Sequence, residues 1–159
     1  YTRTSCSEHE LVQLADLLDQ AVKMARFATV SNEVEIVREY QAVPAMQADP
    51  AELLQVFVNL ITNAVQAMDG QGRVTLTIQS EAGKVLVSIK DTGPGIPAAS
   101  LSKLFTPFFT TKERGVGTGL GLSIVRTLVN KYGGDIGVES EEGKGATFQI
   151  RFPLPSLVT

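Results

Sequence analysis

Hydrophobic residues recur at helical spacing in three stretches of the chain. Residues 10–27 place apolar side chains every three or four positions along one side, which is typical of an amphipathic helix. A second helix is predicted over residues 50–68, because Asp49 suits an N-cap and Pro50 the first helical position. A third is predicted over residues 120–131, where a following Gly-Gly pair would end it.

Alternation of apolar and polar residues predicts five strands. The first is expected at an edge of the sheet, and the short connection over residues 81–83 suits a hairpin between the second and third. The strands are predicted over residues 33–40, 73–79, 84–91, 136–138 and 147–152.

Residues 92–119 are rich in glycine and proline and show little periodicity, so a long loop is predicted, with one short helix near residues 98–103. A loop of this length in a compact domain is usually functional. The order helix, strand, helix, two strands, loop, helix, two strands predicts an α/β sandwich with helices on one face of a mixed sheet.

Composition narrows the class of protein. With 159 residues, 43% hydrophobic and 19% charged, the chain fits one soluble globular domain. A net charge of −3 does not favour nucleic acid or anionic lipid as a partner. A lone cysteine, Cys6, cannot form an internal disulfide and suits a reducing compartment such as the cytoplasm. The start at Tyr1 without an initiator methionine indicates a piece of a longer protein.

The second predicted helix carries a narrow polar sector that contains amides and one hydroxyl but no charge. Such amides must be hydrogen-bonded or must bind something. An asparagine oxygen suits Mg²⁺ that is already bound to phosphate and water. The alternative is a polar seam satisfied by neighbouring backbone. The sector consists of Gln55, Asn59, Thr62, Asn63 and Gln66.

Asp91 ends the strand predicted over residues 84–91 and lies on the same side as its apolar residues, so a carboxylate occupies a core position at the rim of the sheet. A partly buried carboxylate needs hydrogen-bond donors, and an adenine amine would be one. Gly93 and Gly95 would let the backbone approach the base and adopt positive φ. The alternative is a plain turn in which Asp91 caps its own backbone.

Glycines alternate with other residues immediately before the third predicted helix. Backbone N–H groups at a helix start, aided by the helix dipole, hold phosphate well. The run matches neither the Walker nor the dinucleotide pattern, and a flexible cap is the alternative, but phosphate contact is favoured. The glycines are Gly115, Gly117, Gly119 and Gly121.

Four motifs in order make the chain similar to the catalytic, ATP-binding domain of a bacterial sensor histidine kinase, within the gyrase, Hsp90, histidine kinase and MutL (GHKL) superfamily. The resemblance covers about residues 8–152, and the wording of the N and F boxes is similar to nitrogen-regulation and dicarboxylate-sensing kinases. It implies a two-layer α/β sandwich of the Bergerat type with a flexible ATP lid. The motifs are the N box (59–64), the G1 box (91–96), the F box (104–112) and the G2 box (117–122).

The resemblance implies roles for individual residues. Asn63 would coordinate Mg²⁺ and Asp91 would bind the adenine amine. Lys112 would contact the γ-phosphate, the alternative being a solvated lysine. Gln66 stands where many relatives carry a cation, which leaves the phosphate-neutralising residue open. The other nucleotide contacts implied are Gly93, Gly95, Ile96, Phe105, Gly117, Thr118, Gly119, Leu120, Gly121 and Leu122.

Transfer to a protein side chain is favoured over hydrolysis. ATP-hydrolysing clamps of the superfamily place a glutamate base four residues before the magnesium asparagine, where this chain has Asn59, which cannot accept a proton at neutral pH. The catalytic residues that the resemblance implies are Asn59, Asn63 and Lys112. The alternatives are a clamp-type ATPase, an anti-sigma-type serine kinase and a module used only for partner contact.

The phosphoacceptor is expected outside this chain. His9 is the only histidine, and no Arg-Thr-Pro follows it, so a solvated surface role is expected. The resemblance implies a dimerisation and phosphoacceptor hairpin as partner, ATP and Mg²⁺ as cofactors, and a response regulator as an indirect partner. Residues 1–7 would be a remnant of that hairpin or a linker, residues 8–155 the ATP-binding domain, and residues 156–159 a tail.

Overall fold

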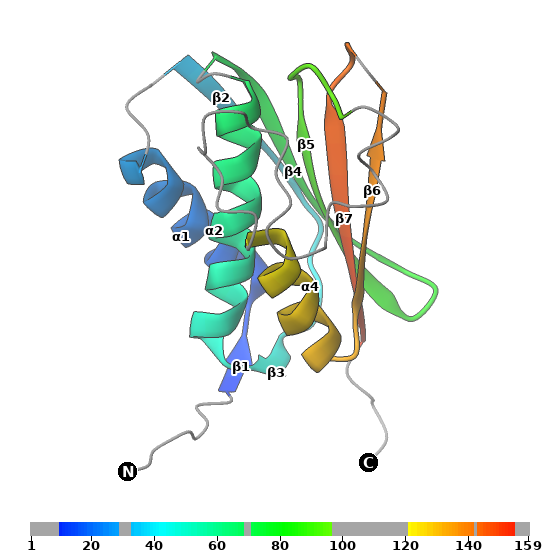
Figure 1. Ribbon diagram of the computed structural model, residues 1–159. Helices are drawn as coiled ribbons and strands as arrows, with labels where there is room; N and C mark the ends of the chain where they lie inside the picture. The colour runs from blue at the N-terminus through cyan, green and yellow to red at the C-terminus, as the bar shows by residue number, and fades with distance from the viewer. Residues whose placement is uncertain (1–9, 29–32, 69–70, 97–120, 142, 155–159) are drawn as a thin grey trace.

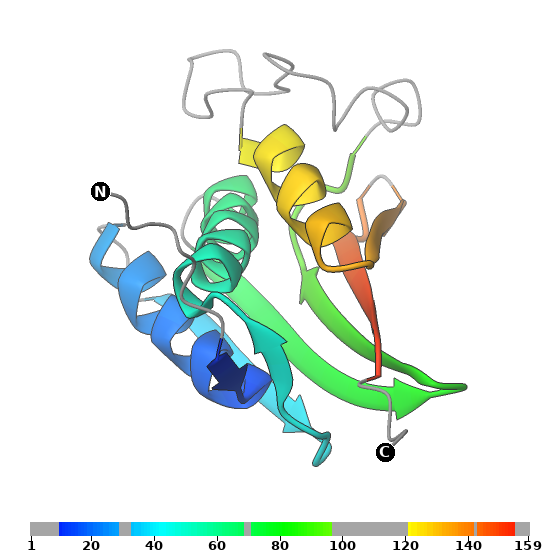
Figure 2. The ribbon, with the colours of Figure 1, turned by 90° about the horizontal axis from the view of Figure 1, so that it is seen from below.

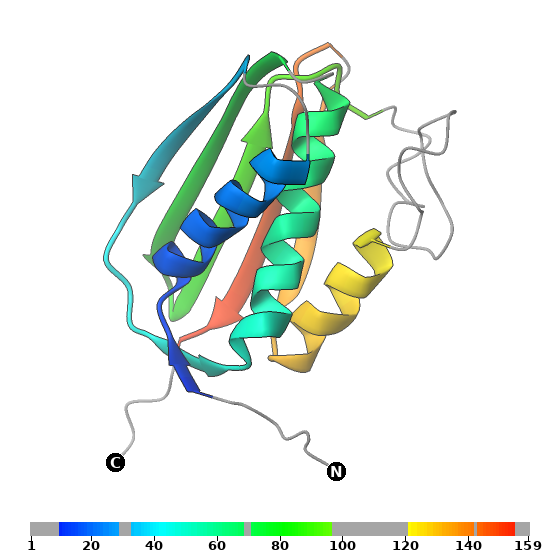
Figure 3. The same ribbon diagram turned by 90° about the vertical axis from the view of Figure 1, so that its left-hand side faces the viewer.

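The computed structural model describes residues 10–28, 33–68, 71–96, 121–141 and 143–154. In this part of the chain a five-stranded sheet forms one layer, and helices cover one of its faces (Figures 1 and 3). The predicted α/β sandwich with helices on one face is confirmed.

The five-stranded sheet is mixed. β2 and β4 run parallel, and the other neighbouring pairs run antiparallel. β2 lies at one edge, as predicted, and β6 lies at the other. In spatial order the strands are β2 (Glu33–Tyr40), β4 (Gln71–Glu81), β5 (Lys84–Asp91), β7 (Ala146–Pro153) and β6 (Asp135–Ser140).

The helices are α1 (Leu14–Ala28), α2 (Pro50–Ala67) and α4 (Gly121–Lys131). α2 lies between the other two, which Figure 2 shows in a view along its axis. The predicted cap is confirmed, because the Asp49 carboxylate accepts a hydrogen bond from the Ala51 N–H at 2.9 Å. Among the described residues, no helix is long and apolar enough to cross a membrane.

One hydrophobic core lies between the helices and the sheet. Strand residues alternate between buried and more exposed positions, so one face of each central strand packs against the helices. Burying a large apolar side chain contributes about 1.5–3 kcal/mol. The largest fully buried side chains include Phe57, Leu53, Leu60 and Ile61 of α2, Leu76 and Ile78 of β4, Ile89 of β5, and Ile150 and Phe152 of β7.

The first predicted helix begins later than its periodicity indicated. Glu10–Val12 forms a short strand, β1, that pairs antiparallel with β3 (Met46–Ala48), which was not predicted. The Gln13 carbonyl accepts the N–H groups of Asp16 and Leu17, so α1 starts at the next residue, Leu14. Three-residue strands are too short to show alternation, and their pairing depends on chain distant in sequence.

Candidate functional site

Segments far apart in the sequence meet at one end of the sheet. The carboxyl ends of β5 and α2 lie there, together with the turn between β6 and β7 (Figures 1 and 3). The last residue of β5 and the five residues after it, Asp91–Ile96, are called the G1 loop here. Residues 140–146 are called the β6–β7 turn.

Asp91 is the buried charged residue that the described chain places at this end. Its side chain shares the inward face of β5 with the core residues and is 4% exposed. Oδ1 accepts hydrogen bonds from the Gly93 N–H at 2.8 Å and from the Ala146 N–H at 3.3 Å. Burial raises the pKa of Asp91 above its ordinary value, and the two backbone hydrogen bonds partly offset that rise.

The two hydrogen bonds to Asp91 differ in how far apart their partners lie in the sequence. The Gly93 bond is the local turn that the alternative interpretation predicted. The Ala146 bond is not local, since it joins β5 to β7 across 55 residues of sequence. Both use Oδ1, so neither of them occupies Oδ2, the second oxygen of a buried carboxylate.

Two glycines let the G1 loop and the β6–β7 turn meet. Gly95 has φ +81° and Gly145 has φ +94°, both in the left-handed region. A Cβ at Gly95 would collide with the Glu141 carbonyl, and one at Gly145 with the Asp91 carbonyl. The positive φ predicted for Gly95 is confirmed. The positive φ predicted for Gly93 is wrong. Close packing against Met68, rather than a left-handed backbone, restricts the residue at this position.

The G1 loop also rests on the last turn of α2. The Thr92 hydroxyl accepts the Arg73 N–H at 3.1 Å and lies 3.4 Å from Met68 Sδ. A Cβ at Gly93 would lie 3.3 Å from the carbonyl oxygen of Ala67. Asn63 lies four residues before Ala67, about 6 Å along the helix axis. The aspartate and the asparagine are therefore carried by segments that touch at this end.

The polar sector of α2 is present as predicted. Asn59, Thr62, Asn63 and Gln66 are half-buried, and Gln55 is exposed. Thr62 Oγ1 is buried without a hydrogen-bond partner. Within the described chain no side-chain hydrogen bond joins Asn59 or Asn63 to the protein, so the polar seam satisfied by backbone finds no support there.

The donor set around α2 fits a metal ion that arrives with its own ligands. In the described ranges no three His, Cys, Asp or Glu side chains are grouped closely enough to hold a metal. A neutral amide oxygen such as that of Asn63 suits Mg²⁺ that keeps water and phosphate oxygens as its other ligands. Asn63 could therefore supply one oxygen ligand to a Mg²⁺ ion that arrives on a nucleotide.

Several predicted site residues fall outside the described ranges, namely Phe105, Lys112, Gly117, Thr118, Gly119 and Leu120, as do Gly115, His9, Cys6 and the short helix expected near residues 98–103. Of the others, Gly121 is the first residue of α4, and Leu122 and Ile96 are half-buried against the core. Ile96 also donates its N–H to Ser140 Oγ at 2.6 Å.

The β6–β7 turn is the part of the site that sequence reasoning missed. Ser140, Gly145 and Ala146 all contact the G1 loop or hydrogen-bond to a residue that does. From the sequence, only a connection between the strands predicted over residues 136–138 and 147–152 was expected here. Its two glycines were the available signal, but the partner of a turn is set by strand pairing, which no local pattern reports.

The mixed sheet, the helices on one face and the buried carboxylate at the end of β5 define the class of two-layer α/β sandwiches of the Bergerat type. Residues 48–156 match the family described as histidine kinase-, DNA gyrase B- and HSP90-like ATPases, and the chain belongs to that family.

Known proteins agree with this assignment. Sensor histidine kinase ZraS of Escherichia coli (strain K12) is 38% identical over 146 residues, which are 91% of this chain and 31% of ZraS. The catalytic domain of histidine kinase ThkA superposes with a TM-score of 0.80 at 32% identity, covering 92% of this chain and 96% of that domain. Full-length ShkA in complex with AMPPNP gives a TM-score of 0.82 at 31% identity, covering 96% of this chain and 32% of ShkA.

The chain spans between 18% and 34% of the length of the curated relatives it matches. The predicted resemblance to the ATP-binding catalytic domain of a sensor histidine kinase is confirmed.

Proposed function

We propose that this domain binds Mg·ATP and passes the γ-phosphate to a histidine on a dimerisation hairpin located elsewhere in the full-length protein. A response regulator would then receive the phosphoryl group from that histidine. The observation that carries the proposal is Asp91, a buried carboxylate whose two backbone hydrogen bonds use one oxygen, in a chain of this family.

Adenine recognition follows from the chemistry of that carboxylate. A buried carboxylate is costly unless donors satisfy it. The exocyclic amine of adenine would donate to Oδ2, whereas guanine presents a carbonyl oxygen at the corresponding position, which would repel it. Gly93, Gly95 and Ile96 follow on the G1 loop and would line the base.

The phosphates would lie toward α2 and the start of α4. Asn63 would hold Mg²⁺, which when bound would neutralise part of the phosphate charge. The N-terminus of α4, an eleven-residue helix that begins at Gly121, is the positive end of the helix dipole and would attract phosphate oxygens. Lys112 remains the proposed γ-phosphate contact.

Phosphoryl transfer needs positioning and charge neutralisation more than a base on the nucleotide side. Asn59 supports transfer over hydrolysis, because an amide cannot activate water by taking its proton. The solved ShkA structure supports an adenine nucleotide as ligand, since it is a complex with AMPPNP.

Nucleotide titration tests the binding half of the proposal. Calorimetry with Mg·ATP, Mg·GTP and ADP should show adenine-selective binding to the chain. Asp91→Asn should weaken ATP binding about tenfold to a hundredfold, because the amide turns a donor toward the adenine amine. Asp135→Asn, which alters an exposed ion pair with Arg151, is the matched control and should bind as the unaltered chain does. Equal affinity for ATP and GTP contradicts the role of Asp91.

Label transfer tests the catalytic half. The chain is mixed with the purified dimerisation hairpin of the same kinase and γ-labelled ATP, and the acid stability of the labelled protein is measured. An acid-labile label on the hairpin is expected for phosphohistidine. An acid-stable label would favour the serine kinase alternative, and release of free phosphate alone would favour the clamp-type ATPase.

A further inference from the structure

The hydroxyl of Ser140 connects the G1 loop to the β6–β7 turn. It is the last residue of β6 and is half-buried. Its Oγ accepts the Ile96 N–H at 2.6 Å and donates to the Gly145 carbonyl at 3.1 Å. A hydroxyl can do both at once, because it has one donor hydrogen and two acceptor lone pairs.

The β6–β7 turn holds the G1 loop at three points. The Ala146 N–H reaches Asp91 at the start of the loop, and the Gly143 N–H donates to the Pro94 carbonyl at 2.6 Å in its middle. Ser140 holds the loop at its end, on Ile96. Of these three bonds from the turn, two come from backbone groups and one comes from a side chain.

We propose that Ser140 is a positioning residue for adenine recognition, which it serves by fastening the G1 loop to the β6–β7 turn so that Asp91 and Ile96 keep their places around the base. The proposal rests on the nucleotide-binding function proposed above. Ser140 would not touch the nucleotide; it acts through the loop.

Loss of the hydroxyl would act on both segments. The Ile96 N–H and the Gly145 carbonyl would lose a partner in a half-buried place. Gly145 packs directly against the backbone of Asp91 and precedes Ala146 in the chain. A shift of the turn would therefore move Ala146 relative to Asp91. The Ala146 bond to Asp91 is long at 3.3 Å and would weaken first. The aspartate would then be less firmly oriented, and ATP binding would have to order the loop.

The test compares Ser140→Ala with Ser140→Thr, which keeps the hydroxyl. Ser88→Ala is the matched control, since Ser88 lies on β5 and alternates with the residues that face the core. ATP and GTP affinities, binding stoichiometry and the thermal midpoint are measured for each. Ser140→Ala should bind ATP about tenfold more weakly with unchanged stoichiometry and reduced preference for ATP over GTP. Ser140→Thr and Ser88→Ala should retain both affinity and preference.

Stoichiometry and base preference separate positioning from unfolding, since an unfolded fraction lowers the number of sites without changing the selectivity of those that remain. Ser140→Ala with wild-type affinity and preference would overturn the proposal, as would Ser140→Thr losing as much as Ser140→Ala. Amide exchange at Ile96 without nucleotide separates this idea from the proposed function. Protection in the unaltered chain that Ser140→Ala loses shows the fastening even if ATP does not bind, whereas equal exchange in both overturns it.

Discussion

Asp91 shows at the scale of one residue that a functional group can cost stability. Burial raises the pKa of its carboxyl in the folded chain above the value in the unfolded chain. Between those two values the folded state holds more protons, so stability falls as pH rises through that window. At neutral pH the ionised carboxylate therefore makes the folded domain less stable than a neutral group of the same shape would.

Asp91→Asn should accordingly raise the free energy of unfolding at neutral pH while weakening ATP binding. The asparagine oxygen can still accept the Gly93 and Ala146 N–H groups, and the buried charge is gone. Urea unfolding at neutral pH, and again below the ordinary carboxyl pKa, measures the free energy of unfolding of both proteins. The extra stability of Asp91→Asn should shrink at the lower pH. A variant less stable than the unaltered chain at neutral pH would contradict the prediction.

The same carboxyl predicts a pH dependence of binding. A protonated Asp91 cannot accept the adenine amine at the oxygen that carries the proton, so ATP affinity should fall as pH is lowered through its raised pKa. Protonation of the ATP phosphates also affects affinity, and Asp91→Asn corrects for it. The ratio of the two affinities should decline toward acidic pH in calorimetric titrations. A ratio that stays constant would contradict a titrating role for Asp91.

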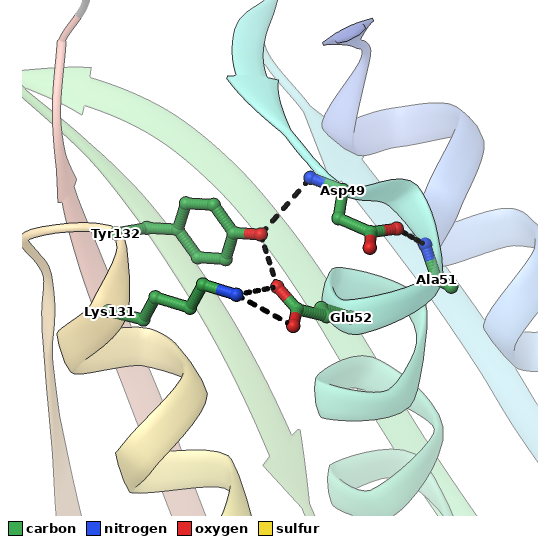
Figure 4. Close-up of polar contacts among 5 residues, drawn as sticks. All are labelled: Asp49, Ala51, Glu52, Lys131 and Tyr132. Atoms are coloured by element: carbon green, nitrogen blue, oxygen red, sulfur yellow. Dashed lines mark hydrogen bonds and ion pairs between the residues drawn. The ribbon is translucent and has the colours of Figure 1, made fainter. Parts of the chain in front are cut away.

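At the scale of elements, one polar cluster joins the start of α2 to the end of α4 (Figure 4). The Tyr132 hydroxyl accepts the Asp49 N–H at 3.1 Å and donates to Glu52 Oε1. Lys131 Nζ contacts both oxygens of Glu52, at 2.9 and 2.8 Å. Burial and the Glu52 hydrogen bond raise the pKa of Tyr132 to about 12, so it remains a donor throughout the neutral range.

This cluster and the proposed nucleotide site lie at opposite ends of α2. The cluster lies at the end of α2 opposite to the one that contacts the G1 loop, and it includes Lys131, the last residue of α4, and Tyr132, which follows. The crossing of the two helices is thereby held at the far end, while Asn63 and Gly121 lie toward the proposed phosphates.

Tyr132→Phe should lower the free energy of unfolding by about 1–3 kcal/mol, because the Asp49 N–H and Glu52 each lose a partly buried partner. Tyr40→Phe is the matched control and should cost less, since the Tyr40 hydroxyl bonds to Asp19, a carboxylate half in solvent that Arg38 also contacts. Urea unfolding measures both. A control that loses as much as Tyr132→Phe would show that the helix junction is not special.

At the scale of the whole molecule, α1, α2, α4 and the sheet share one core. A ligand bound at one end should therefore stabilise the entire domain, by about 2.7 kcal/mol at a concentration one hundred times its dissociation constant. Mg·ATP should raise the thermal midpoint in a single transition, Mg·GTP should not, and Asp91→Asn should lose the ATP effect. Two separate transitions, or equal shifts with both nucleotides, would contradict this.

Prediction from sequence succeeded for features that depend on residues close together in the chain. The Asp49 cap, the start of α2 and the inward face of Asp91 depend on neighbours within a turn or a strand. It failed for β1 and β3, which in the described part of the chain pair with each other and not with the five-stranded sheet. It also failed for Ser140, whose partners Ile96 and Gly145 are brought to it by sheet pairing.

By itself the sequence determined the three helices and the five strands of the described α/β sandwich, the polar sector of α2 and the kind of chemistry the motifs can perform, because capping, periodicity and side-chain type act locally. Only the tertiary structure decided that Asp91 lies beside Ala146, and that the β6–β7 turn holds the G1 loop. The physical reason is that β5 and β7 are far apart in sequence, and their pairing depends on the packing of the whole core. This pairing brings together backbone groups that no local pattern connects.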